Sequence, residues 1–354
     1  MVWKKLLFLP LALIYQLVLF IRHKLYDLGI IRSKSFDLPI ICVGNLSFGG
    51  TGKTPHIEYL TELLKSDYKI AILSRGYKRK SKGFKLADEN AQYREFGDEP
   101  MQFLNKYDDI YIAVDENRVS GVNKLLRLDP GPNVILLDDA FQHRKIRAGL
   151  NILLTDYHNL YSRDFLFPAG NLRDSIMAAK RADIIVVTKT PKVFSPFIHR
   201  NLKESIKPAA HQKLCFSYLE YGRFIPLSKS NKINFPRQVN NIIMFSGIAN
   251  PYPLQEHLQQ MCQSLVTVGF KDHHEYTEKD ILGIIEEFHN ILGKSKIMVT
   301  TEKDAMRLVD SPYFCHLEHL PVFYVPVKVQ FHEKEKSSFD KQVLAYVREN
   351  QGNR

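Results

Sequence analysis

Cysteine is scarce in this chain, with four residues among 354, and the four lie far apart without forming a CxxC pair. This spacing argues against a disulfide framework and against a zinc site. It fits a protein of a reducing compartment in which the thiols are free and structural. The four positions are Cys42, Cys215, Cys262 and Cys315.

Low-complexity tracts and convincing internal repeats are also missing, and no motif typical of an RNA- or DNA-binding module is present. Basic residues outnumber acidic ones by 49 to 38, which gives a net charge of +11 and a pI near 9.3. Such a surplus favours an anionic partner, whether nucleic acid, anionic lipid or a phosphorylated substrate. Because the basic residues are scattered, we expect no nucleic-acid partner, and no obligate protein partner is evident.

An apolar run of full membrane-spanning length is missing as well. The segment Leu6–Ile21 would reach about 24 Å as a helix, short of the roughly 30 Å hydrocarbon core, and Pro10 and Gln16 interrupt it. Basic residues stand on both sides of the segment, and no small-residue cleavage site follows. We expect a helix that lies on an anionic membrane surface. A buried core helix and a transmembrane anchor are the alternatives.

Short apolar runs alternate with amphipathic segments along the rest of the chain. Nearly continuous apolar strands with helices between them are typical of a parallel sheet that is covered on both faces, so we predict a doubly wound α/β domain. The expected strands are Pro39–Val43, Lys69–Leu73, Ile110–Val114, Val134–Leu137, Ile152–Leu154 and Asp183–Val187, and the expected helices include Pro55–Lys65 and Arg118–Leu128.

A second, smaller α/β unit is predicted after an irregular polar stretch that begins near Phe216. Its expected strands are Asn241–Phe245, Leu265–Phe270, Lys296–Thr300 and Val322–Val327, and its expected helices are Pro251–Cys262, Glu278–Leu292 and Glu302–Val309. A chain of this length suits about two domains. The tail, Lys336–Glu349, is expected to form a helix that packs on either domain.

A phosphate-binding loop is predicted directly after the first strand. The stretch SFGGTGKT ends in Gly52, Lys53 and Thr54, which match the end of the Walker A pattern G-x-x-x-x-G-K-[ST]. Glycines let backbone amides approach phosphate oxygens, and the start of the following helix favours negative charge. Lys53 would reach the β- and γ-phosphates and Thr54 would hold magnesium. Ser47 stands where the pattern has its first glycine.

Acidic residues follow a buried strand at Asp138 and Asp139. A hydrophobic strand that ends in Asp is typical of a Walker B site, which supplies a carboxylate to magnesium, although an Asp-rich turn is the alternative. His143 lies just beyond the strand, where α/β proteins bind ligands.

Two further segments carry weaker signals. In FGDEP, Asp98 could accept the proton of an attacking hydroxyl, but acidic residues at a helix start are common. In FKDHHEY, His273 and His274 follow a strand, and a surface loop explains them equally well. The tetrapeptide TEKD occurs at Thr277–Asp280 and Thr301–Asp304; both copies resemble capping boxes, and the second could face a cleft between the domains.

These segments together resemble the tetraacyldisaccharide 4′-kinase family of lipid A biosynthesis. The stretches that carry the resemblance occur in the family's order from about residue 40 to 310: VGNLSFGGTGKTP, LSRGYKRKSKG, FGDEP, LLDDAFQHR, FPAGNLRD, the DH of FKDHHEY, and VTTEKDAMRL. Ala140 departs from the glycine of many relatives, and His274 adds a second histidine.

The resemblance implies transfer of the γ-phosphate of ATP, with Mg²⁺, to the 4′-hydroxyl of a tetraacyldisaccharide 1-phosphate, a lipid A precursor, which yields lipid IVA. It implies an enzyme at the cytoplasmic face of the bacterial inner membrane, attached peripherally or monotopically. The implied domains are a membrane-associated helix (1–30), a P-loop kinase domain (31–215), a β linker (216–236), a second α/β domain (237–330) and a C-terminal helix (331–354).

The resemblance also assigns roles to residues of this sequence. Asp98 is implied as the catalytic base, His273 as its partner, and Lys53 as a catalytic residue of the phosphate loop. Metal binding is implied for Thr54, Asp138 and Asp139, and contact with phosphates or substrate for Arg118, Arg173 and His143. ATP binding is implied for Ser47, Phe48, Gly49, Gly50, Thr51, Gly52, Lys53 and Thr54.

Two other classes of function stay open from the sequence. A membrane-associated P-loop ATPase or GTPase switch that acts on a protein would share the phosphate loop. A non-catalytic module that binds anionic lipid would share the basic charge and the N-terminal helix, but it would not need Lys53.

Overall fold

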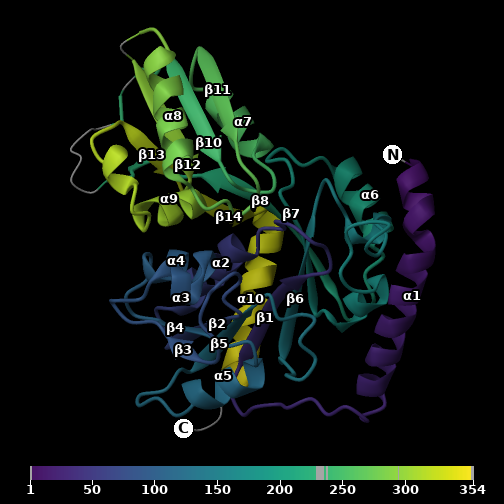
Figure 1. The fold of residues 1–354 in the computed structure, drawn as a ribbon. Coiled ribbons are helices and arrows are strands. Elements are labelled where there is room, and N and C mark those ends of the chain that lie inside the picture. The colour runs from purple at the N-terminus through teal and green to yellow at the C-terminus, as the bar shows by residue number, and fades with distance from the viewer. Residues whose placement is uncertain (1, 229–234, 237, 294, 352–354) are drawn as a thin grey trace.

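Two β-sheets organise the chain, and Figure 1 shows the smaller one standing above the larger one. The computed structural model describes residues 2–228, 235–236, 238–293 and 295–351. Within these ranges the first sheet has nine strands in the order β14-β8-β7-β6-β1-β5-β2-β4-β3, and the second has five in the order β11-β10-β12-β13-β9. Adjacent strands that are distant in sequence are the mark of a doubly wound fold.

The first sheet is parallel except for its two outer strands, β3 and β14, which run antiparallel to their neighbours. Its central strands are buried along their whole length, because helices cover both faces. The predicted fold class is confirmed. The strands are β1 (Ile40–Asn45), β2 (Ile70–Ser74), β3 (Lys85–Leu86), β4 (Tyr111–Val114), β5 (Val134–Asp138), β6 (Leu150–Asp156), β7 (Ile184–Thr188), β8 (Lys213–Tyr221) and β14 (Val327–Phe331).

Helices and apolar clusters lie on both faces of this sheet. One cluster includes side chains of α2 and α10, and the other includes side chains of α5 and α6. The helices of the first unit are α1 (Val2–Asp27), α2 (Lys53–Leu64), α3 (Tyr93–Phe96), α4 (Asp98–Leu104), α5 (Arg118–Leu125), α6 (Pro196–Ile206) and α10 (Glu333–Glu349), with short 3-10 turns at η1 (Tyr161–Arg163) and η2 (Ile176–Arg181).

The second unit repeats the α/β pattern on a smaller scale, with parallel strands and one antiparallel edge strand. Its elements are β9 (Ile225–Pro226), β10 (Asn241–Ser246), α7 (Tyr252–Gln259), β11 (Ser264–Gly269), α8 (Glu278–Asn290), β12 (Lys296–Thr301), α9 (Glu302–Val309), η3 (Phe314–His316) and β13 (Val322–Val325). Thr277 and Asp280 form a full capping box at the start of α8, as TEKD predicts.

The chain enters and leaves the second unit through two paired strands of the first sheet. β8 and β14 lie antiparallel to each other, with Tyr221 opposite Val327. The predicted linker, 216–236, therefore starts inside β8, and the predicted second domain, 237–330, ends inside β14; residues 229–234 and 237 lie outside the described part of the chain. The tail helix α10 packs on the first sheet.

Helix α1 runs along one side of the first unit (Figure 1). Its segment Leu7–Asp27 is the one stretch, among the described residues, that is long and apolar enough to cross a membrane, and only 11% of that window is buried. The helix is thus longer than the apolar run Leu6–Ile21, so length alone does not separate a spanning helix from one that lies on a surface.

Candidate active site

The phosphate loop lies between the end of β1 and the start of α2 at the carboxyl edge of the first sheet. Gly52 precedes the helix with φ 85°, a left-handed conformation that favours glycine. Helix α2 begins at Lys53, two residues before the predicted Pro55, so Lys53 and Thr54 both belong to its first turn. That position gives the loop the positive end of the helix dipole.

Side chains from the neighbouring strands hold the loop in shape. The Thr188 hydroxyl donates to the carbonyl oxygen of Thr51 at 2.9 Å, and Lys189 Nζ donates to the carbonyl oxygen of Gly50 at 2.5 Å. Asn45 Nδ2 donates to the Thr51 hydroxyl at 3.0 Å. These bonds occupy carbonyl oxygens that would otherwise repel an anion, so the loop is prepared for phosphate.

Asp139 sits among cations beside the loop. Lys53 Nζ lies 3.7 Å from Asp139 Oδ2, and Arg173 Nη1 donates to the same oxygen at 3.0 Å. Burial opposes ionisation, but Lys53 and the hydrogen bond from Arg173 outweigh it and lower the pKa of Asp139 to about 2. The structure therefore brings together the predicted residues Lys53, Asp139 and Arg173.

Asp138 has the opposite electrostatics. Its side chain is fully buried, and neither carboxylate oxygen has a hydrogen-bond partner. Burial, together with the charges of Glu99 and Asp139, raises the pKa of Asp138 to about 7. A buried carboxylate without a donor is expensive unless a cation or proton completes its environment.

Arg118 and His143 are two further predicted site residues near the acidic turn. Arg118 is 1% exposed, and its guanidinium donates to the backbone oxygens of Asp115 and Asp138 at 2.8 Å and 3.1 Å. Burial and the nearby Arg118 lower the pKa of His143 to about 4, so its imidazole is neutral. Arg118 therefore contacts the backbone of Asp138, one of the predicted metal-binding residues, and not its carboxylate.

Asp98 and His273 meet across the two units. Asp98 is the first residue of α4, and Gly97 before it has φ 89° and lies so close to Tyr77 that a Cβ would stand 2.7 Å from the Tyr77 carbonyl oxygen. His273 Nδ1 lies 2.6 Å from Asp98 Oδ2. Burial disfavours the charged form, but hydrogen bonds from His273 and Arg307 outweigh it and hold the pKa of Asp98 well below its usual range.

Two basic residues of α9 were not among the predicted site residues. Arg307 forms a buried ion pair with Asp98, and Lys303 Nζ lies 3.0 Å from Glu99 Oε1. Glu99 also receives a long hydrogen bond of 3.5 Å from the Thr54 hydroxyl. The second TEKD motif, directly after a buried strand, was the signal that could have identified Lys303, and the stretch VTTEKDAMRL that contains it also includes Arg307.

Comparison with known proteins identifies the family of the chain. The family model described as tetraacyldisaccharide-1-P 4′-kinase matches residues 4–348. The chain belongs to this family. It is 45% identical to the tetraacyldisaccharide 4′-kinase of Flavobacterium johnsoniae, with 98% of each chain covered. It is 41% identical to that of Bacteroides thetaiotaomicron, with 97% of this chain and 93% of the relative covered.

A solved structure of the tetraacyldisaccharide 4′-kinase family shares the fold. It is LpxK from Aquifex aeolicus in complex with ATP, with a TM-score of 0.71, 29% identity, and 97% of this chain and 99% of that chain covered. The predicted family and enzyme class are confirmed by these matches. The roles of the individual residues stay predictions that rest on the geometry described above.

Proposed function

We propose that this chain transfers the γ-phosphate of ATP to the 4′-hydroxyl of a tetraacyldisaccharide 1-phosphate. One observation carries the proposal beyond family membership: the phosphate loop and the pair Asp98 and His273 lie at the same edge of the first sheet, linked through Glu99, which follows Asp98 and contacts Thr54. A nucleotide phosphate and an acceptor hydroxyl can therefore meet between the two units.

The nucleotide phosphates would lie against the loop from Ser47 to Thr54. Lys53 would neutralise the charge on the β- and γ-phosphate oxygens. Asp139 Oδ2 lies 3.7 Å from Lys53 Nζ and keeps this side chain beside the loop. The braced carbonyl oxygens of Gly50 and Thr51 support this placement, because they leave less negative charge on the phosphate side.

The residues present fit a magnesium ion. Asp138 carries two buried oxygens without partners, and Asp139 follows it in the acidic turn. The Thr54 hydroxyl donates to Glu99, whose charge acts on Asp138. Among the described residues no group of three or more His, Cys, Asp or Glu side chains forms a complete metal cage. Mg²⁺ does not require one, because it keeps several waters and phosphate oxygens as ligands. When bound, it would neutralise charge on the transferring phosphoryl group.

Asp98 is placed to accept the proton of the acceptor hydroxyl. Its lowered pKa keeps it ionised across the physiological range, and His273 and Arg307 fix its position. Phosphoryl transfer passes through a loose transition state, so orientation of the hydroxyl contributes more than strong basicity. We assign His273, rather than His274, as the partner of the base, because His274 is bonded to Asp280.

Helix α1 would hold the enzyme on the membrane that contains its lipid substrate. Tyr15, Arg22 and His23 bond the second half of the helix to the first unit, through Arg173, Gln142 and Asp174 respectively. Exposed apolar side chains on a helix that is held against a folded unit suit a position on the membrane surface. We propose the cytoplasmic face of the inner membrane as the location of the reaction, because ATP is available on that side. The exposed apolar side chains of α1 include Leu7, Leu11, Leu13, Ile14, Leu17, Val18, Phe20 and Ile21.

The proposal is tested by incubating the purified full chain with γ-labelled ATP, Mg²⁺ and tetraacyldisaccharide 1-phosphate in mixed micelles. We expect label in a lipid with one additional phosphate, located on the 4′-oxygen by mass spectrometry. Release of labelled inorganic phosphate without any labelled lipid, stimulated by a protein fraction, would instead support the nucleotide-switch alternative. Binding of the lipid without any transfer of label to it would support the alternative of a non-catalytic lipid-binding module.

A further inference from the structure

The guanidinium of Arg307 donates hydrogen bonds to three residues at the junction of the two units. Its Nε donates to Asp98 Oδ2 at 2.9 Å, and its Nη2 is bonded to the same oxygen. Its Nη1 donates to Asp304 Oδ1 at 2.8 Å and to the Gly247 carbonyl oxygen at 3.3 Å. Only 3% of the Arg307 side chain is exposed, so these contacts are shielded from water.

The same residues build the turn that carries His273. The amide of Gly247 donates to Asp304 Oδ2 at 3.1 Å, and the amide of His273 donates to the Gly247 carbonyl oxygen at 3.0 Å. The Thr301 hydroxyl donates to Asp304 Oδ2 at 2.6 Å. Arg307 therefore contacts Asp98 directly, and it supports His273 through Asp304 and Gly247.

Helix α9 brings this arrangement onto the first unit, and Figure 1 shows it next to α4. Lys303 stands one helical turn before Arg307 and pairs with Glu99, the residue after Asp98. Two adjacent carboxylates at the start of α4 thus face two basic residues at positions i and i+4 of α9. These two ion pairs fix how the second unit sits against Asp98, the proposed catalytic base.

We propose that Arg307 is a positioning residue for phosphoryl transfer, which fixes the carboxylate of Asp98 and aligns the His273 turn of the second unit with it. Three donors converge on Asp98 Oδ2, namely Nε and Nη2 of Arg307 and Nδ1 of His273, and together they fix the rotation of the carboxylate. This inference rests on the proposed kinase function, and it extends the role of Arg307 from Asp98 to the alignment of the His273 turn through Asp304 and Gly247.

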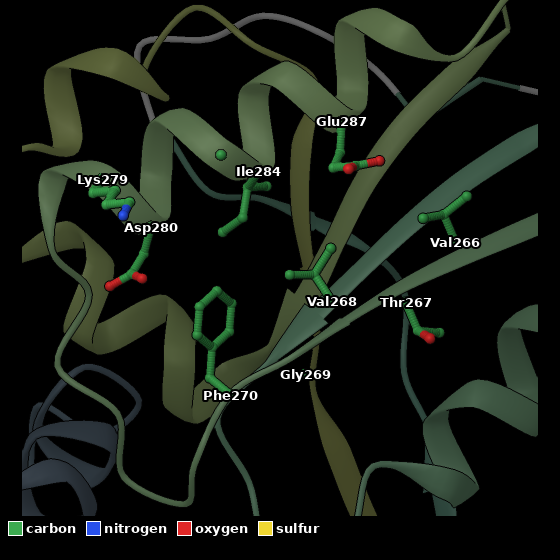
Figure 2. Close-up of a pocket in the computed structure, with 10 residues that line it drawn as sticks. Val266, Thr267, Val268, Gly269, Phe270, Lys279, Asp280, Ile284 and Glu287 are labelled. Carbon is green, nitrogen blue, oxygen red and sulfur yellow. The ribbon is translucent and has the colours of Figure 1, made fainter.

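The second unit also contains a pocket that lies away from Asp98 and Arg307. It has a volume of about 540 Å³ between β11 and α8, and Figure 2 shows Val268, Phe270 and Ile284 directed into it. Nothing in the structure indicates which molecule would cover these side chains, so no function follows from this cavity.

The test compares Arg307→Ala, Arg307→Lys and the control Arg200→Ala in the labelled-lipid assay. Arg200 lies on the exposed surface of α6 and pairs there with the exposed Glu204, so its removal should leave kinetics unchanged. For Arg307→Ala we expect kcat to fall about 100-fold while the KM for ATP changes less than about 3-fold, because the phosphate loop is untouched. Guanidinium chloride at about 50 mM should restore at least about 10-fold of the lost rate, and sodium chloride should not.

The outcomes separate this inference from the kinase proposal. Absence of labelled lipid with the unaltered chain refutes the kinase function itself. An active parent with normal kcat in Arg307→Ala refutes only the positioning role, as does a loss of kcat that guanidinium fails to restore. If Arg307→Ala does not fold, Arg307→Lys decides: reduced kcat with an unchanged unfolding temperature supports the role, and parental kcat overturns it.

Discussion

His273 Nδ1 lies 2.6 Å from Asp98 Oδ2, although the two residues are 175 positions apart and belong to different units of the fold. The neighbouring His274 is bonded to Asp280 at 2.9 Å, within its own unit. Two consecutive histidines therefore have different surroundings. His273 has φ 57°, a conformation that turns its side chain away from the path of the preceding strand and toward the first unit.

This difference predicts unequal effects of two matched substitutions. His273→Ala should lower kcat about 100-fold or more, because Asp98 loses an oriented partner at the reacting centre. His274→Ala should lower kcat less than about 5-fold, since the contacts of His274 with Asp280 and Phe270 lie within the second unit, away from Asp98. Steady-state kinetics of both variants provide the measurement, and a greater loss in His274→Ala would reverse the assignment.

Lys53 gives a second prediction with a control on the same helix. Lys53→Ala should reduce transfer at least about 1000-fold, because a phosphate charge would lose its fixed cation. Lys65→Ala, at the other end of α2, removes an exposed pair with Glu62 and should leave the rate unchanged. Transfer to labelled lipid is the readout. Near-parental turnover in Lys53→Ala would remove the phosphate loop from the mechanism.

We expect the substitution Asp138→Asn to have opposite effects on activity and on stability. The folded pKa of Asp138, about 7, lies above the usual unfolded value, so its contribution becomes increasingly unfavourable to the fold as pH rises from about 4 to 7. In EDTA, Asp138→Asn should therefore raise the free energy of unfolding, by up to about 2 kcal/mol more at pH 8 than at pH 5.

The same variant should lose transfer activity and need more Mg²⁺ for half-maximal rate, because a neutral amide binds the ion weakly. Urea unfolding at both pH values and a Mg²⁺ titration of the rate check the two effects. Lower stability than the parent at pH 8 would contradict the proposed electrostatics of this buried carboxyl.

Helix α1 supplies a prediction for membrane attachment. Leu13 and Leu17 are 57% and 58% exposed, and the double change of both to Ser should weaken binding to anionic phosphatidylglycerol vesicles about 10-fold or more by removing apolar area. Leu292→Ser alters an even more exposed leucine on the second unit and should have no effect. Vesicle sedimentation measures both, and deletion of residues 1–22 should abolish binding. Full binding of the truncated chain would exclude α1 as the anchor.

Local sequence pattern was sufficient for the first sheet and the phosphate loop, because both depend on neighbouring residues. Continuous apolar runs predicted β1, β2 and β5 to within one or two residues at each end. The pair β8 and β14 was not predicted, because both strands are only partly buried and their paired residues lie more than 100 positions apart. Only the folded chain reveals that pairing.

The same distinction applies to the site. Gly52, Lys53 and Thr54 were recognisable from adjacent letters, whereas the ion pair of Arg307 with Asp98 joins residues 209 positions apart. Burial of Asp138 could be expected from its strand, but the absence of any hydrogen-bond partner for its carboxylate depends on three-dimensional packing. Long-range electrostatics therefore had to come from the structure.

The return of the chain through β14 has a consequence for biosynthesis. The core beneath α2 includes Phe331, Phe339 and Val343, which follow the whole second unit in the sequence and are therefore synthesised after it. The second unit has its own apolar core and can become ordered earlier, while the phosphate loop at the start of α2 still lacks its foundation. We therefore expect nascent chains to acquire nucleotide binding only after β14 and α10 have been synthesised, so a chain that still lacks them would not consume ATP.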